Sequence, residues 1–107
     1  MSAPQAPPAP PTTIFHVLHA ADLAWDADDC YHAKSLATEG FLHASYREKV
    51  VESARLYFPA DADLRVMEID PMGLDVRVAQ TPRGPMPHVY GALPRRHVVR
   101  SVTLDAL

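Results

Sequence analysis

Proline spacing limits how this 107-residue chain can fold, because proline lacks the backbone N–H that helices and inner strands require. Five of the eleven prolines lie in the first 13 residues, which read "MSAPQAPPAPPTT". We therefore expect residues 1–12 to form a disordered, Pro-rich tail, either dispensable or a ligand for a proline-reading module. The remaining prolines separate short elements, which predicts a single domain over residues 13–107.

The composition is that of an ordinary globular protein with one modest core. Apolar residues make up 48% of the chain, and the net charge of -3 argues against a nucleic-acid partner. The single cysteine, Cys30, excludes an internal disulfide and fits a reducing cytosol. No apolar run approaches the roughly 18 residues of a membrane helix, and the N-terminus does not read as a secretion signal. We expect a cytoplasmic protein without a membrane partner, of unknown oligomeric state.

Alternation of apolar and polar residues predicts six strands, at residues 13–19, 41–44, 64–70, 74–79, 88–93 and 97–104. In the first strand, Ile14, His16 and Leu18 should share one face. Three prolines make the stretch "TPRGPMP", residues 81–87, look like a loop. With two or three helices in the first half, this pattern predicts an α+β domain.

The clearest predicted helix begins at Ser45-Tyr46-Arg47-Glu48, which has the spacing of a capping box. Pro59 should end it. A shorter helical turn over residues 35–40 should stop at Gly40. The apolar face of the longer helix is predicted to contain Val50, Ala54, Tyr57 and Phe58.

Three of the six histidines lie in or beside predicted strands with apolar neighbours: His16, His43 and His88. A buried imidazole must pair both ring nitrogens or lose about 1–3 kcal/mol for each unpaired group. Each ring could simply donate to a backbone carbonyl and hold strands together. Two mid-strand cases, His16 and His43, in so small a domain favour a shared polar site instead.

Other chemistries fit the sequence less well. Three histidines could hold zinc, but none has the helical spacing of a metalloprotease pair, so we expect no metal. The chain has no Gly-x-Ser-x-Gly elbow of a serine hydrolase. Five arginines and no acidic residue lie between Val76 and Leu104, which indicates either a solvated edge or a site for a phosphate-bearing ligand.

Several stretches together resemble the bacterial family called domain of unknown function 952, over about residues 13–105. They read "IFHV", "GFLHAS", "EKVVESARLYF", "LRVMEID" and "PHVYGAL". Members of that family look like compact relatives of the ADP-ribosylation fold, in which two small, mostly antiparallel sheets are splayed around a cleft for nicotinamide adenine dinucleotide (NAD). The resemblance implies that His16 and His43 match the two histidines of one branch of that superfamily and are the catalytic candidates.

The resemblance further implies NAD or an ADP-ribose-type ligand, with transfer of ADP-ribose as the activity. Ser45, two residues after His43, should face the same side. Arg47 and Arg83 are the candidates for holding the pyrophosphate. His88 and Tyr90 either line the cleft, with Tyr90 stacking on a planar ring, or fill the core.

One departure from the family pattern leaves a second function open. The resemblance implies a glutamate ahead of the "PHVYG" segment, yet Ala79 and Gln80 occupy that neighbourhood. Without a carboxylate, stabilisation of an oxocarbenium ion has no obvious agent. The alternative is a binding or interaction module that keeps the fold without its chemistry.

Overall fold

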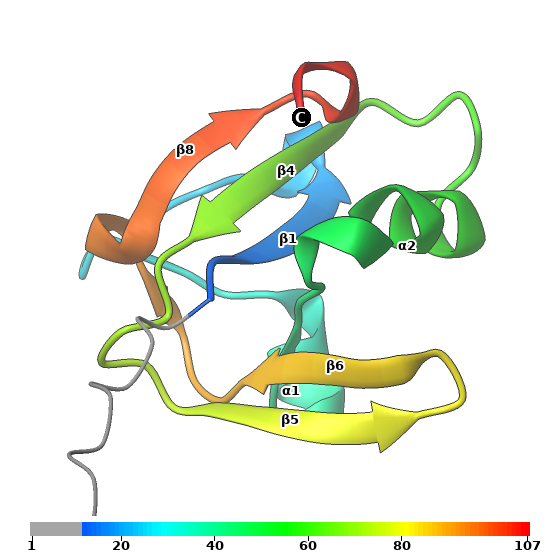
Figure 1. Ribbon diagram of the computed structural model, residues 1–107. Helices are drawn as coiled ribbons and strands as arrows, with labels where there is room; N and C mark the ends of the chain where they lie inside the picture. Colours follow the sequence, from blue (N-terminus) through cyan, green and yellow to red (C-terminus); the bar gives the residue numbers. More distant parts are fainter. Residues whose placement is uncertain (1–11) are drawn as a thin grey trace, which may run out of the picture.

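The computed structural model describes residues 12–107 (Figure 1). Apart from Thr12, the predicted tail lies outside the described residues. The strands are β1 (Ile14–His19), β2 (Cys30–Tyr31), β3 (Leu42–His43), β4 (Leu64–Ile69), β5 (Val76–Thr81), β6 (Gly84–Val89), β7 (Leu93–Pro94) and β8 (Val98–Val102). The α-helices are α1 (Lys34–Glu39) and α2 (Val50–Tyr57), and short 3-10 turns cover Ala20–Asp22, Arg47–Lys49, Arg95–His97 and Leu104–Ala106.

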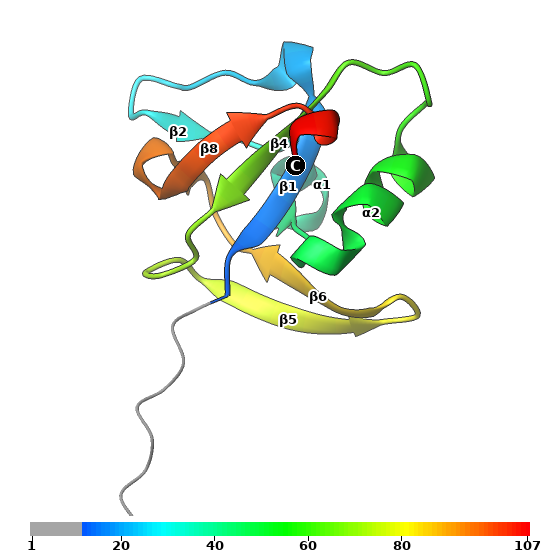
Figure 2. The same cartoon turned by 45° about the horizontal axis from the view of Figure 1, so that its top comes forward.

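The strands form two three-stranded sheets, ordered β1-β4-β8 and β3-β6-β5, and a small pair, β2-β7. All of these pairings are antiparallel. Figures 1 and 2 show the two larger sheets as separate layers, with α2 beside β1 and the tip of the β5–β6 hairpin reaching beneath α2. The predicted α+β class with antiparallel sheets and few helices is confirmed.

Side-chain alternation along β1 divides the core, as predicted. Ile14 and Leu18 join a cluster that includes Met67 and Leu42, whereas Phe15 packs with Val50 and Val66 in a second cluster. All of these residues are buried. Burial on both faces of β1 explains why the strand reads as a nearly continuous apolar run in which His16 stands out.

Residues 42–45 belong to both larger sheets. Leu42 and His43 pair with Val89 and His88 of β6. Two residues later, Ser45 exchanges backbone hydrogen bonds with Phe15 of β1, with N···O distances of 2.7 and 2.8 Å. This shared segment sets where one sheet stands relative to the other.

The predicted loop at residues 81–87 is wrong, because β6 begins at Gly84 and contains Pro85 and Pro87. Pro87 presents its carbonyl to the Ala44 N–H, 3.1 Å away, and not to β5. Alternate residues of a strand face the same neighbour, so neither proline removes a bond from the β5 ladder. The hairpin turn closes with Gly84 at φ +92°, a conformation that favours glycine.

The predicted capping box is also wrong. Tyr46 precedes the first helical turn, and no side chain caps it. Ser45 is buried, and its hydroxyl lies 2.9 Å from the Ser53 hydroxyl. The strand-like bridge to Phe15 therefore determines the orientation of Ser45. The predicted helix face holds for Val50 and Ala54, but Tyr57 is 68% exposed because α2 ends there.

Candidate functional site

A cavity of about 830 Å³ opens where β1, α1, the shared segment 42–45, α2 and the β5–β6 hairpin meet. Its volume falls within the roughly 300–1,000 Å³ typical of small-molecule sites. Five of the seven predicted site residues line it: His16, His43, Ser45, Arg83 and His88. The histidines come from three different strands, so the antiparallel pairing of β3 with β6 and the bridge to β1 bring them together.

His16 is a buried, neutral ring held from both sides. Its Nδ1–H donates to the His43 carbonyl at 2.6 Å, and the Tyr31 hydroxyl donates to its Nε2 at 3.2 Å. Burial lowers the pKa of His16 to about 4, and burial raises the pKa of Tyr31 to about 12. Both groups are therefore uncharged at neutral pH. A ligand contact through Nε2 of His16 would have to replace the Tyr31 hydroxyl.

His43 lies at the exposed rim of the cavity and is paired with a carboxylate. Its Nε2 is 2.7 Å from Oε2 of Glu39, at the end of α1. The His43 ring meets the His88 ring edge-on, with centroids 5.2 Å apart. Burial is the main cause of the lowered pKa of His88, and electrostatic interaction with the neighbouring His43 lowers that pKa further. Phe41 stacks on His88 with centroids 3.9 Å apart and an interplanar angle of 9°. These rings form an aromatic wall.

Arg83 occupies the tip of the β5–β6 hairpin and reaches α2. Its Nη2 donates to the Ser53 hydroxyl at 3.0 Å, and its Nε donates to Oε1 of Glu52 at 3.3 Å. Arg83 first, and then Lys49, lower the pKa of Glu52. Ser53 is in turn bonded to Ser45, so the guanidinium and two hydroxyls form one network. A guanidinium has five N–H donors, and these two bonds use two of them, while Tyr57 is a further neighbour of the Arg83 guanidinium.

The structure does not bring the other two predicted residues to the cavity. The Arg47 guanidinium lies 5.9 Å from the centroid of the Phe15 ring, in the turn that replaced the predicted capped helix start. Tyr90 lies just beyond β6, where the Arg77 guanidinium covers its ring at 4.2 Å. Tyr90 also packs against Phe41, so it supports the aromatic wall from outside the cavity.

The sequence did not indicate the other residues that line the cavity, which include Glu39, Phe41, Ser53 and Tyr57. Glu39 and His43 are four residues apart, but a chain turn at Gly40 separates them, so helical spacing alone did not indicate a pair. Ser53 follows Ser45 by eight residues, and only the bend at residues 46–49 brings the two hydroxyls together.

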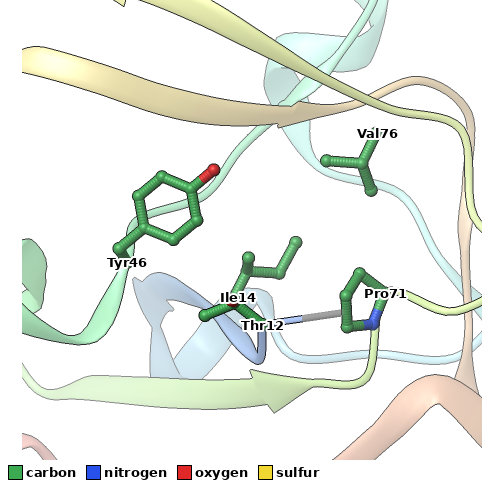
Figure 3. Close-up of a pocket in the computed structure, with 5 residues that line it drawn as sticks. All are labelled: Thr12, Ile14, Tyr46, Pro71 and Val76. Carbon is green, nitrogen blue, oxygen red and sulfur yellow. The ribbon is translucent and has the colours of Figure 1, made fainter. Parts of the chain in front are cut away.

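Within residues 12–107, no group of three or more His, Cys, Asp or Glu side chains is placed to hold a metal ion. In the same residues, no helix is long and apolar enough to cross a membrane. A second, smaller pocket of about 240 Å³ is lined by Thr12, Ile14, Tyr46, Pro71 and Val76 (Figure 3). None of these five residues is charged, so this pocket has no cationic side chain to offer an anionic ligand.

The crystal structure of protein CC0527 from Caulobacter crescentus is similar to this chain, with a TM-score of 0.74 and 29% sequence identity. The match covers 88% of this chain and 87% of that one. A double mutant of the same protein matches with a TM-score of 0.73 and 30% identity over the same shares. No curated protein matches the chain. The family model described as "Protein of unknown function (DUF952)" matches residues 17–101. The chain therefore belongs to the DUF952 family.

Proposed function

We propose that the cavity binds NAD or another ADP-ribose-type ligand, and that the protein transfers ADP-ribose from NAD. This proposal rests on one observation: planar rings and hydrogen-bond donors for an anion line the same cavity. Phe41, His43 and His88 supply planar rings, and Arg83 with its serine partners supplies donors for an anion. A nucleotide-type ligand has both a flat ring and phosphate oxygens.

The resemblance to the ADP-ribosylation fold forms part of the same proposal. Two antiparallel three-stranded sheets with a cavity at their junction support it. Breaking the bond between ribose and nicotinamide develops positive, oxocarbenium-like charge on the sugar. Rigid contacts to the ribose and amide would lower that barrier, and side chains on paired strands are stiffer supports than loop side chains.

A binding module without chemistry is the second candidate. The absence of an acid at Ala79 and Gln80 favours it, and so does the use of both His16 nitrogens by the protein itself. Glu39 favours the enzyme, because it places a carboxylate on the cavity wall through a different element.

Isothermal calorimetry with NAD and with ADP-ribose tests the binding proposal. We expect heat of binding from at least one of them, and no heat from either at millimolar concentration would rule it out. Nicotinamide release, compared between the wild type and His43→Ala, then separates the enzyme from the binding module. His32→Ala is the matched control, because His32 also contacts a carboxylate, Asp26 at 2.5 Å, but does not line the cavity.

A further inference from the structure

The cavity contains a carboxylate–imidazole pair that the sequence pattern did not indicate. Glu39 ends α1 and His43 ends β3, and their contact at 2.7 Å spans the turn between these elements. The side chains are 49% and 53% exposed, and both line the cavity wall. Such an exposed pair contributes little to stability, and its place on the cavity wall distinguishes it from the exposed His32–Asp26 pair.

The contact fixes which nitrogen of His43 is available. A carboxylate accepts hydrogen bonds, so Nε2 carries the proton and Nδ1 of the neutral ring is bare. Within residues 12–107, Nδ1 of His43 has no hydrogen-bond partner. The other titratable groups facing the ring are His88 on β6, edge-on to it, and His16 on β1, which is bonded to the His43 carbonyl. Neither His88 nor His16 is oriented by a carboxylate, so neither offers the proton acceptor that His43 does.

We infer that His43 is the general base of this site and that Glu39 is its positioning residue, so that the acceptor of ADP-ribose is water or a hydroxyl group. This inference rests on the proposed function. An anionic acceptor such as phosphate has no proton to lose on attack, and a base held by a carboxylate gives it no advantage. A neutral hydroxyl must lose its proton as it attacks, which is the step a correctly oriented imidazole accelerates.

Transfer from NAD to an acceptor R–OH forms one bond to the ribose and breaks another. The acceptor oxygen forms a bond to the ribose C1′ carbon while its proton passes to Nδ1 of His43. The C1′–N bond to nicotinamide breaks, and its electron pair stays on the ring nitrogen, which becomes neutral. His43 then releases the proton to solvent, and the products are the ADP-ribosylated acceptor (free ADP-ribose when the acceptor is water), nicotinamide and one proton.

The test measures NAD affinity by calorimetry and nicotinamide release in water, for the wild type, Glu39→Gln and Glu39→Asp. Glu48→Gln is the matched control, because Glu48 is exposed and does not line the cavity. A parallel reaction in inorganic phosphate measures transfer to an anionic acceptor. We expect Glu39→Gln to retain NAD affinity and KM while kcat falls about 100-fold or more, in the range of general-base contributions. Glu39→Asp should recover part of the rate, and Glu48→Gln should match the wild type.

The outcomes separate the inference from the proposed function. If the wild type binds neither NAD nor ADP-ribose, the proposed function fails and the inference fails with it. If it binds NAD but releases no nicotinamide, the binding proposal stands and the inference is wrong. Equal turnover by Glu39→Gln and the wild type, or transfer to phosphate in preference to water, would overturn the inference alone. A lower kcat with a parallel loss of NAD affinity would also overturn it, because it would make Glu39 a ligand contact.

Discussion

His16 donates its Nδ1–H to the backbone carbonyl of His43, and this 2.6 Å bond joins the two central histidines of the cavity through main chain rather than through their rings. The two histidines differ in burial and in hydrogen bonding. His16 is buried with both nitrogens paired, whereas the ring of His43 is exposed and paired through one nitrogen. The bond also ties β1 to the shared segment 42–45 beside the Ser45 bridge.

Replacing His16 should destabilise the protein, and replacing His43 should not. His16→Ala leaves the His43 carbonyl and the Tyr31 hydroxyl without their partner, which should lower the free energy of unfolding by about 1–3 kcal/mol. His43→Ala removes an exposed ring and should change it by less than about 0.5 kcal/mol. Urea denaturation monitored by fluorescence measures both. Equal losses from the two substitutions would contradict this distinction.

The low pKa of His16 predicts that stability falls in mild acid. In the unfolded chain the ring takes up a proton near pH 6.5, but in the folded protein it does so only near pH 4. Between these values the unfolded chain binds more protons, so stability is full above pH 6.5 and falls as the pH is lowered, by at most about 1.4 kcal/mol per unit. The lowered pKa of His88 acts in the same direction.

Denaturation at several pH values between 5.5 and 7 measures this slope. The lowered pKa values of Asp26 and Glu52 also make stability fall in acid, but chiefly below that range. His16→Gln is the informative comparison, because an amide can donate to the His43 carbonyl and accept from Tyr31 without titrating. We expect a shallower slope for that variant. An unchanged slope would mean that another group carries the pH dependence.

Replacing Arg83 should weaken the binding of a phosphate-bearing ligand. Arg83→Met removes the guanidinium, and loss of hydrogen bonds to a charged group at about 1.5–3 kcal/mol corresponds to roughly a 10- to 100-fold weaker Kd. Arg83→Lys keeps the charge but not the planar fork and should recover only part of the affinity. Calorimetry with ADP-ribose measures the effect. Arg100→Met is the control, since Arg100 is paired with Glu68 away from the cavity, and a similar loss there would argue against a specific subsite.

The serine pair gives a test of how α2 begins. Ser45→Ala and Ser53→Ala should each lower the free energy of unfolding by about 1 kcal/mol, and the double variant should lose less than the sum, because the two hydroxyls bond to each other. Glu48→Ala should be nearly neutral. If Glu48→Ala instead lowered stability by about 0.5 kcal/mol or more, a capping box would be present after all.

Local sequence patterns correctly predicted those elements whose tertiary contacts favour the same conformation. The period of two along residues 14–19 correctly predicted a strand, and Gly40, at φ +87°, ends α1 as expected. The same rules failed where tertiary contacts decide. Ser45 follows the sequence rule for a cap but is drawn into a bridge with Phe15, and Pro85 and Pro87 are tolerated because their missing N–H groups do not face β5.

The residues of the candidate site also divide into those that local patterns indicated and those that tertiary contacts place. His16 and His43 were identifiable because polar rings interrupt apolar runs, which is visible in the sequence alone. Arg47 and Tyr90 do not line the cavity, because Arg47 lies in a 3-10 turn and not in the expected capped helix, and Tyr90 lies just beyond the end of β6. Glu39 and Ser53 reach the cavity through turns whose geometry no local pattern encodes.

Because residues 42–45 are hydrogen-bonded to one sheet at one end and to the other sheet at the far end, this wall of the cavity is held between the two sheets. The tip of the β5–β6 hairpin is instead anchored to α2 by the side chain of Arg83. We therefore expect a bulky ligand to enter when that tip separates from α2. Arg83 would then give up its ion pair with Glu52 and bind the negative charge of the ligand. The side chain of Arg83 would then both hold the hairpin against α2 and bind the anionic ligand.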